Sequence, residues 1–313
     1  MSRKGIIERE RLFSFYASNL SIYHPDVTDR FLCPICLTLF TRDALINDPP
    51  KVSLAHIIPK SLKGRLYTLV CRRCDNWIGS EYDSQLAREK HFCDWVEGAA
   101  DISGQLKYDD KEVPVECCLK GSTIELRDIP KKSPPNSWEQ FLRTAVCDWS
   151  NFKFTFTVST FNPSKLNISI LCSAFLMMFY QLGYEYTLSP NVHKVRQFIQ
   201  GSGFPENMHK GILRLSEGSQ DLPHILPSVS ILVEPQNVRS FIVILPSPRK
   251  EEAARCVLLP GFGEDGENAY TNILNSVKPF GKFRATLIPD YLKNHLIDTK
   301  YKWFANWLWK NVV

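Results

Sequence analysis

The chain has 313 residues, of which 44% are hydrophobic, 12% aromatic and 23% charged. This composition is close to the average of globular proteins, which excludes a disordered, collagenous or coiled-coil chain. The length is roughly twice the ~150 residues of a common domain, so we expect two domains. The net charge of +5 is too small to indicate a nucleic-acid partner by itself.

The first ten residues, Met1 to Glu10, are charged and lack the apolar core of a signal peptide. No stretch reaches the ~18 consecutive apolar residues that a membrane span requires. We therefore expect a cytoplasmic protein that makes no membrane contact. In that compartment, ten cysteines favour metal binding, catalysis or plain burial over disulfide bonds.

Four of the cysteines form two Cys-x-x-Cys pairs, Cys33/Cys36 and Cys71/Cys74. Each pair closes a tight loop that presents two sulfurs to one ion, and four thiolates suit tetrahedral Zn²⁺. We therefore predict one structural zinc ion. The 34 residues between the pairs exceed the ~15–20 of a plain zinc ribbon, which indicates an inserted element.

The inserted element has the pattern of a β-hairpin. Ser-Leu-Ala-His-Ile-Ile-Pro at 53–59 leads into a loop with Lys and Gly, and an apolar run over 66–70 returns to Cys71. A helix is expected after Cys74. At ~100° per residue, Asn76 and Asp83 fall on nearly the same face of that helix.

Basic residues gather in the same part of the chain. No Asp or Glu occurs from Pro49 to Cys74, whereas this stretch has six Lys and Arg residues. An ordinary solvated surface is one interpretation, and contact with nucleic-acid phosphates is the other. The predicted contact residues are Lys60, Lys63, Arg65, Arg72 and Arg73.

Three short segments occur together in a specific order: Cys-Pro-Ile-Cys at 33–36, Ala-His-Ile-Ile-Pro at 55–59, and Cys-Arg-Arg-Cys-Asp-Asn at 71–76, followed by Gly79 and Asp83. With this order, residues 31–92 resemble the HNH (ββα-metal) endonucleases, in particular the subgroup with two flanking zinc-binding Cys-x-x-Cys pairs. The resemblance implies a hairpin and a helix that hold one divalent cation and hydrolyse DNA. It also implies, by association, a role in bacterial or phage DNA restriction and antiviral defence.

The resemblance also implies roles for individual residues. His56 would be the general base, since an imidazole titrates near neutral pH and can take a proton from the attacking water. Asn76 and Asp83 would act with it and help to hold Mg²⁺ or Mn²⁺, which prefer oxygen ligands. Asp75 is a further candidate ligand.

Two positions depart from the family's pattern. Ala55 precedes His56, where many HNH motifs have an acidic metal ligand, and Asp75 follows the last cysteine, where Asn or His is usual. Asp75 or Asp83 would have to replace the missing ligand. Two other functions therefore stay open, a catalytically degenerate nucleic-acid-binding protein and a zinc-stabilised protein-interaction module. For His56, the alternative is a hydrogen-bonded core histidine.

The rest of the chain predicts an α+β domain with mainly antiparallel strands. Helices are expected over about 164–182 and from Ser189 to Gly201, and strands over 152–159, 228–234, 240–246, 254–259 and 283–288. The proline-rich residues 128–137 form the expected hinge. We therefore expect an HNH domain over 1–127 and an α+β domain for targeting, regulation or assembly over 138–313.

An aromatic face is expected near the C-terminus, where Trp303 and Trp307 lie four residues apart, as do Phe304 and Leu308. Such a face either docks on its own domain or contacts a protein partner or a second copy of the chain.

Overall fold

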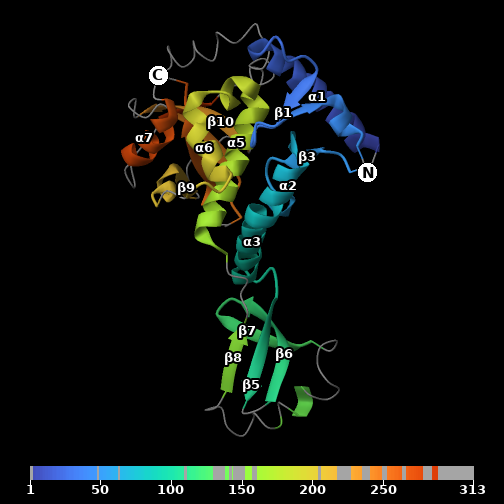
Figure 1. Ribbon diagram of the computed structural model, residues 1–313. Coiled ribbons are helices and arrows are strands. Elements are labelled where there is room, and N and C mark those ends of the chain that lie inside the picture. The colour runs from blue at the N-terminus through green and yellow to red at the C-terminus, as the bar shows by residue number, and fades with distance from the viewer. Residues whose placement is uncertain are drawn as a thin grey trace. The chain divides into compact units, whose positions relative to one another are not determined.

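The structure is a computed structural model that describes most of the chain from Arg3 to Leu287 (Figure 1). The described residues are 3–47, 49–62, 64–108, 111–129, 138–140, 143, 152–156, 161–203, 206–216, 227–234, 240–248, 252–262, 266–277 and 284–287. Most of the expected hinge lies outside them, and so do Lys63 and the expected aromatic helix near Trp303.

The chain divides into two compact units, one made of Met1–Leu86 with Asn162–Val313 and the other of Ala87–Phe161. This division does not coincide with the expected boundary between residues 127 and 138. In the first unit, side chains of the N-terminal helix and of the segment after Asn162 bury one another. The ring of Tyr16 stacks on that of Phe179, for example, with centroids 4.3 Å apart.

Helix α1 (Arg3–Tyr23) opens the first unit. Its buried apolar residues recur every three to four positions, as on one face of a helix: Leu12, Phe13, Tyr16, Ala17 and Leu20. This face packs against β1, β4 and α5. The Tyr16 hydroxyl also hydrogen-bonds that of Thr68, with the two oxygens 2.8 Å apart, so the buried polar end of the ring is satisfied.

Two short antiparallel hairpins follow. β1 (Arg30–Leu32) pairs with β2 (Leu39–Thr41), and β3 (Val52–His56) pairs with β4 (Tyr67–Cys71), which is the hairpin that the sequence predicts. Short 3-10 turns occupy Arg42–Leu45 and Lys60–Leu62. The chain then enters α2 (Arg72–Ile78), a π-helical turn (Gly79–Asp83) and α3 (Ser84–Val96).

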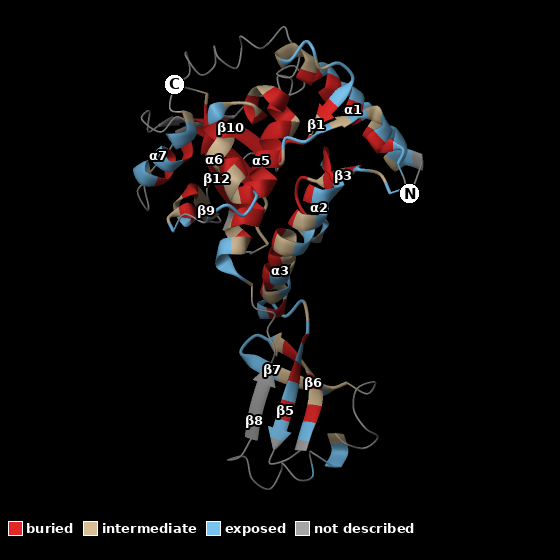
Figure 2. Ribbon diagram, viewed as in Figure 1, coloured by how far each residue is buried: buried red, intermediate tan, exposed pale blue. Residues whose placement is uncertain are grey.

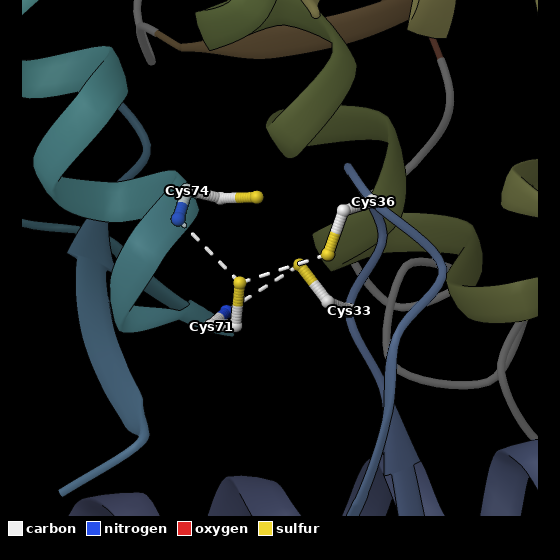
Figure 3. A group of neighbouring side chains, drawn as sticks. All are labelled: Cys33, Cys36, Cys71 and Cys74. Atoms are coloured by element: carbon white, nitrogen blue, oxygen red, sulfur yellow. Dashed lines mark hydrogen bonds between the residues drawn. The ribbon is translucent and has the colours of Figure 1, made fainter.

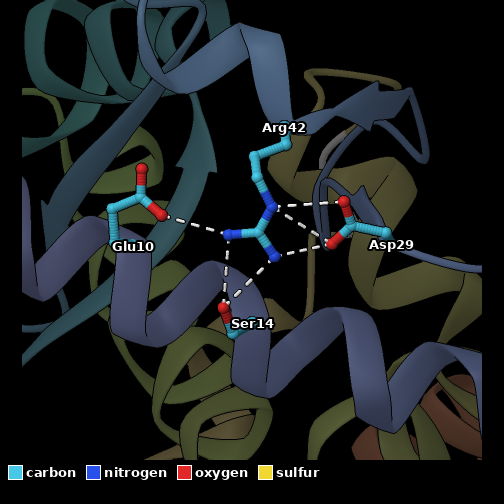
Figure 4. A network of polar contacts seen from close by, with 4 residues as sticks. All are labelled: Glu10, Ser14, Asp29 and Arg42. Atoms are coloured by element: carbon cyan, nitrogen blue, oxygen red, sulfur yellow. Dashed lines mark hydrogen bonds and ion pairs between the residues drawn. The ribbon is translucent and has the colours of Figure 1, made fainter.

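Arg42 ties the first hairpin to α1 (Figure 4). Its guanidinium pairs with Glu10 at 3.0 Å and Asp29 at 2.6 Å and donates to the Ser14 hydroxyl at 3.3 Å. It also lies over the Phe13 ring, 5.1 Å from the centroid. These exposed pairs contribute only ~0–1 kcal/mol each, so their main effect is to orient the hairpin.

Helix α5 (Pro163–Thr187) is buried along nearly its whole length (Figure 2). Asn162 caps its start, where the side chain accepts a hydrogen bond from the Lys165 backbone N–H. The expected end at Gly183 is a kink, because that residue has φ +58° and the helix resumes after it. A Cβ there would lie 2.3 Å from Asn19 Oδ1, so only glycine fits.

By length and composition α5 could cross a membrane, and it is the one such helix among the described residues. However, 89% of its most apolar stretch is buried inside the protein, as in the core helix of a soluble protein. The composition of α5 is therefore weak evidence for a membrane span. The expectation of a cytoplasmic protein without membrane contact stays a prediction.

A five-stranded antiparallel sheet completes the first unit, in the order β13–β10–β11–β12–β9. The strands are β9 (Ile212–Ser216), β10 (Ser228–Glu234), β11 (Ser240–Leu245), β12 (Glu252–Pro260) and β13 (Arg284–Leu287). Helix α5 packs on β11 and β12, and every residue of β11 is buried. Four of these strands were predicted, and their antiparallel pairing is confirmed.

The sequence did not predict β9 or α7 (Ala269–Ser276), which packs against β12. The second predicted helix is split into a 3-10 turn (Pro190–Val192) and α6 (His193–Ile199). Further 3-10 turns lie at Met208–Gly211 and Gly266–Asn268.

The second unit contains a four-stranded antiparallel sheet in the order β7–β6–β5–β8. Its strands are β5 (Ile102–Tyr108), β6 (Lys111–Lys120), β7 (Thr123–Asp128) and β8 (Phe152–Phe156). Two small apolar clusters hold it together, Leu106 with Val113 and Val115, and Trp95 with Ile102 and Cys117. Of these strands only β8 was predicted.

Candidate metal centre and adjacent carboxylates

The two Cys-x-x-Cys pairs come together in space. The sulfurs of Cys33, Cys36, Cys71 and Cys74 all lie within 4.8 Å of one another, and the side chains point toward a common centre (Figure 3). The Cys36 and Cys71 sulfurs are 3.6 Å apart. Tetrahedral Zn²⁺ with ~2.3 Å bonds to sulfur requires a separation of about 3.8 Å, so the four cysteines can hold a metal ion such as zinc.

The four thiols affect one another's pKa values, which are raised for Cys33 and Cys74 and lowered for Cys36 and Cys71. Burial raises the pKa of the Cys33 thiol, whereas the hydrogen bond with Cys33 lowers the pKa of Cys71 to about 7. Backbone N–H groups of Cys71 and Cys74 donate to the sulfurs of Cys33 and Cys71, both at 3.4 Å. These donors favour thiolates, and a metal ion would offset the repulsion between them.

Residues from the C-terminal half position the first Cys-x-x-Cys loop. The Tyr184 hydroxyl donates to the Leu32 carbonyl at 2.6 Å and accepts from the Leu32 N–H at 2.9 Å. The Gln200 side-chain amide donates to the Ile35 carbonyl at 2.6 Å. The loop geometry therefore depends on α5 and on the residue that follows α6.

His56 lies at the end of β3, opposite Tyr67 in the hairpin, with the two ring centroids 4.5 Å apart. Its side chain is partly buried. Burial lowers the pKa of His56, the charge of Asp75 opposes this, and Lys60 lowers the pKa further. The imidazole is therefore neutral near pH 7 and can accept a proton.

Asp75 and Asp83 are each held by a serine. The Ser53 hydroxyl donates to Asp75 Oδ2 at 2.9 Å, and the Ser169 hydroxyl donates to Asp83 Oδ1 at 3.1 Å. Burial raises the pKa of Asp75. Burial also raises the pKa of Asp83 to about 6, the Ser169 bond opposes this, and the charge of Asp75 adds to the rise. A divalent cation between two such carboxylates would stabilise their charged forms.

The π-helical turn changes which residues share a face. In a π-turn, i→i+5 bonds widen the helix, so that each residue advances by less than the ~100° of an α-helix. Asp83 consequently interacts with Asp75, whereas Asn76, its expected partner on the helix face, is exposed. Ala55 is buried, and the carboxylate whose charge raises the pKa of His56 is that of Asp75.

Four of the five predicted nucleic-acid contacts are described, and all four are exposed: Lys60, Arg65, Arg72 and Arg73. They come from the loop of the second hairpin and the first turn of α2. The hydrogen bond to the Cys36 sulfur raises the pKa of Arg73, so this guanidinium also acts as a partner of the cysteine cluster.

Among the described residues, the four cysteines are the only group of three or more His, Cys, Asp or Glu side chains close enough to hold a metal ion. His56, Asp75 and Asp83 interact electrostatically without forming such a group. No family model, curated protein or solved structure matches the chain.

Four positioning residues were missed from the sequence, namely Ser53, Ser169, Tyr184 and Gln200. Ser53 lies inside the motif segment and could have been considered. The other three lie in the C-terminal half, at least 86 residues from the groups that they contact. No local pattern marks them, because their role depends on the packing of α5 and α6.

Proposed function

We propose that the protein is a metal-dependent HNH-type endonuclease that hydrolyses DNA phosphodiester bonds. Zn²⁺ at the four cysteines supports the fold, and the catalytic cation is Mg²⁺ or Mn²⁺. A cytoplasmic location and a role in restriction or antiviral defence belong to the same proposal and rest on composition and resemblance alone.

One observation carries the proposal. His56 ends strand β3 of a hairpin that leads directly into the helix of Asp75, and charge interactions link His56 with Asp75 and Asp75 with Asp83. This order of hairpin, helix and polar groups is what the resemblance to ββα-metal nucleases implies. Exposed cations on the same segment supply a surface for phosphate contacts.

The side chains can perform the steps of phosphodiester hydrolysis. His56 accepts the proton of the attacking water, because its lowered pKa keeps it neutral. Asp75 and Asp83 offer oxygen ligands, with Asp75 in place of the acid that is missing at Ala55. A divalent cation bound there would stabilise charge on the phosphate and the leaving oxygen.

The test is cleavage of supercoiled plasmid by purified, zinc-loaded, full-length protein with Mg²⁺, with Mn²⁺, or with neither cation added after unbound metal has been removed by gel filtration. We expect nicked or linear products only when a divalent cation is present. Equal cleavage by the zinc-loaded protein without added Mg²⁺ or Mn²⁺ would contradict the proposed cation dependence.

A second candidate is a zinc-stabilised module that binds nucleic acid or protein without cleaving DNA. The buried Ala55 and the exposed Asn76 favour it, because both leave the cation with fewer ligands than the family pattern provides. Salt-dependent DNA binding without cleavage under any divalent condition would select this function.

A further inference from the structure

Helix α5 contacts the helical segment that carries the acidic residues at three points. The Lys165 ammonium pairs with Glu81 at 2.6 Å, the Ser169 hydroxyl donates to Asp83 at 3.1 Å, and the Gln85 side chain accepts from the Asn162 N–H at 2.8 Å. The three contacted residues, Glu81, Asp83 and Gln85, occupy every second position across the π-turn and the start of α3.

Ser169 is fully buried in α5, with 0% of its surface exposed, and its hydroxyl is bonded to the Asp83 carboxylate. Asp75 has an equivalent partner, Ser53, within the hairpin. Each carboxylate thus keeps one oxygen occupied by a serine donor. This fixes the orientation of the carboxylate and leaves its other lone pairs for a ligand.

We propose that Ser169 is a positioning residue for the divalent-cation site, so that α5 from the C-terminal half completes the site built by the hairpin and α2. This inference rests on the proposed function. Groups that hydrogen-bond a metal-ligating carboxylate orient it, and their loss typically weakens metal affinity or activity by ~10–100-fold. Ser169 contacts no reacting atom, so its effect passes through Asp83.

The experiment is Mn²⁺ titration of zinc-loaded, full-length protein, followed by electron paramagnetic resonance, together with plasmid cleavage as a function of Mn²⁺ concentration. We expect Ser169→Ala to raise the Mn²⁺ dissociation constant by ~10-fold or more. Saturating Mn²⁺ should return the cleavage rate to near the wild-type value, since the general base is intact. Ser169→Thr, which keeps the hydroxyl, should recover much of the affinity.

The matched control is Ser173→Ala, one turn later on α5 and also buried. It should leave Mn²⁺ affinity unchanged. If Ser169→Ala binds Mn²⁺ as tightly as wild type, or if both alanine variants weaken binding equally, Ser169 has no positioning role, whereas the nuclease proposal stands. If wild-type protein neither binds Mn²⁺ nor cleaves DNA, the proposed function itself fails and this inference fails with it.

Discussion

The cysteine cluster and the acidic group beside it differ in what holds them together. The four sulfurs come from two four-residue Cys-x-x-Cys segments, and backbone N–H groups of the second segment donate to two of them. Asp75 and Asp83 instead depend on a π-turn and on serines from the hairpin strand β3 and the distant helix α5. A site made by local chain closure can be recognised from spacing, whereas a site made by packing cannot.

Zinc removal should have the largest effect, because structural zinc contributes ~10 kcal/mol or more to small sites. We expect about one zinc per chain in wild type, and loss of both zinc and folding in Cys33→Ser or Cys71→Ser. Since Tyr184 and Gln200 bond to the same loop, the loss should extend through the first unit.

Elemental analysis and thermal unfolding followed by circular dichroism measure the two effects of zinc loss. Cys118→Ser, outside the cluster, is the control and should keep its zinc. Soluble, folded wild-type protein without zinc would contradict this prediction, because the fold would then not depend on a metal at the four cysteines.

Substitution of the proposed general base should lower the rate of DNA cleavage without changing DNA affinity. His56→Ala is expected to reduce DNA cleavage by ~10²–10⁴-fold, while zinc content and DNA affinity stay near wild type, because the variant loses a proton acceptor but no phosphate contact. Single-turnover cleavage and fluorescence anisotropy measure the two quantities. His91→Ala, at an exposed position of α3, is the control and should cleave normally. Equal cleavage by His56→Ala would place the chemistry elsewhere in the chain.

Asp83 should make stability depend on pH. Its pKa is about 6 in the folded protein and near 3.8 when unfolded, so the folded state keeps the proton between these values. Stability should therefore fall as pH rises from about 4 to about 6, by up to ~3 kcal/mol, and stay reduced above that range.

Urea unfolding of zinc-loaded protein at pH 5 and pH 7, without other divalent ions, measures this dependence. Asp83→Asn should flatten the profile, because the amide does not ionise. Added Mn²⁺ should stabilise wild type at pH 7 more than this variant, since the ion favours the carboxylate. An identical pH dependence in both proteins would show that Asp83 ionises freely.

Substitution of the basic residues should have the smallest effect, which is on the salt dependence of DNA affinity. The two residues compared differ in whether they contact the cysteine cluster. Arg72→Gln should lower the slope of log affinity against log salt by ~0.9, the value for one phosphate contact. Arg73→Gln should lower it by less, because its guanidinium already hydrogen-bonds the Cys36 sulfur. Binding isotherms at several salt concentrations test this, and an unchanged slope in both variants would make these residues ordinary surface.

Several elements could be predicted because their signals are local. The Asn162–Pro163 start of α5, the hairpin over β3 and β4, and four strands of the larger sheet follow from capping, turn and alternation patterns. Helix α1 and strand β5 also have regular apolar spacing in the sequence, yet neither was predicted.

The sequence by itself identified the four cysteines as a metal site, because each Cys-x-x-Cys segment holds its own two sulfurs close together. Only the structure showed that the charge of Asp75 raises the pKa of Asp83 while Asn76 is exposed, since one π-turn rotates every residue after it. It also decided that the segments before residue 87 and after residue 161 form one unit, with the second unit inserted between them in the sequence. Contacts such as Ser169 with Asp83 form only once the intervening chain has folded, so no local pattern encodes them.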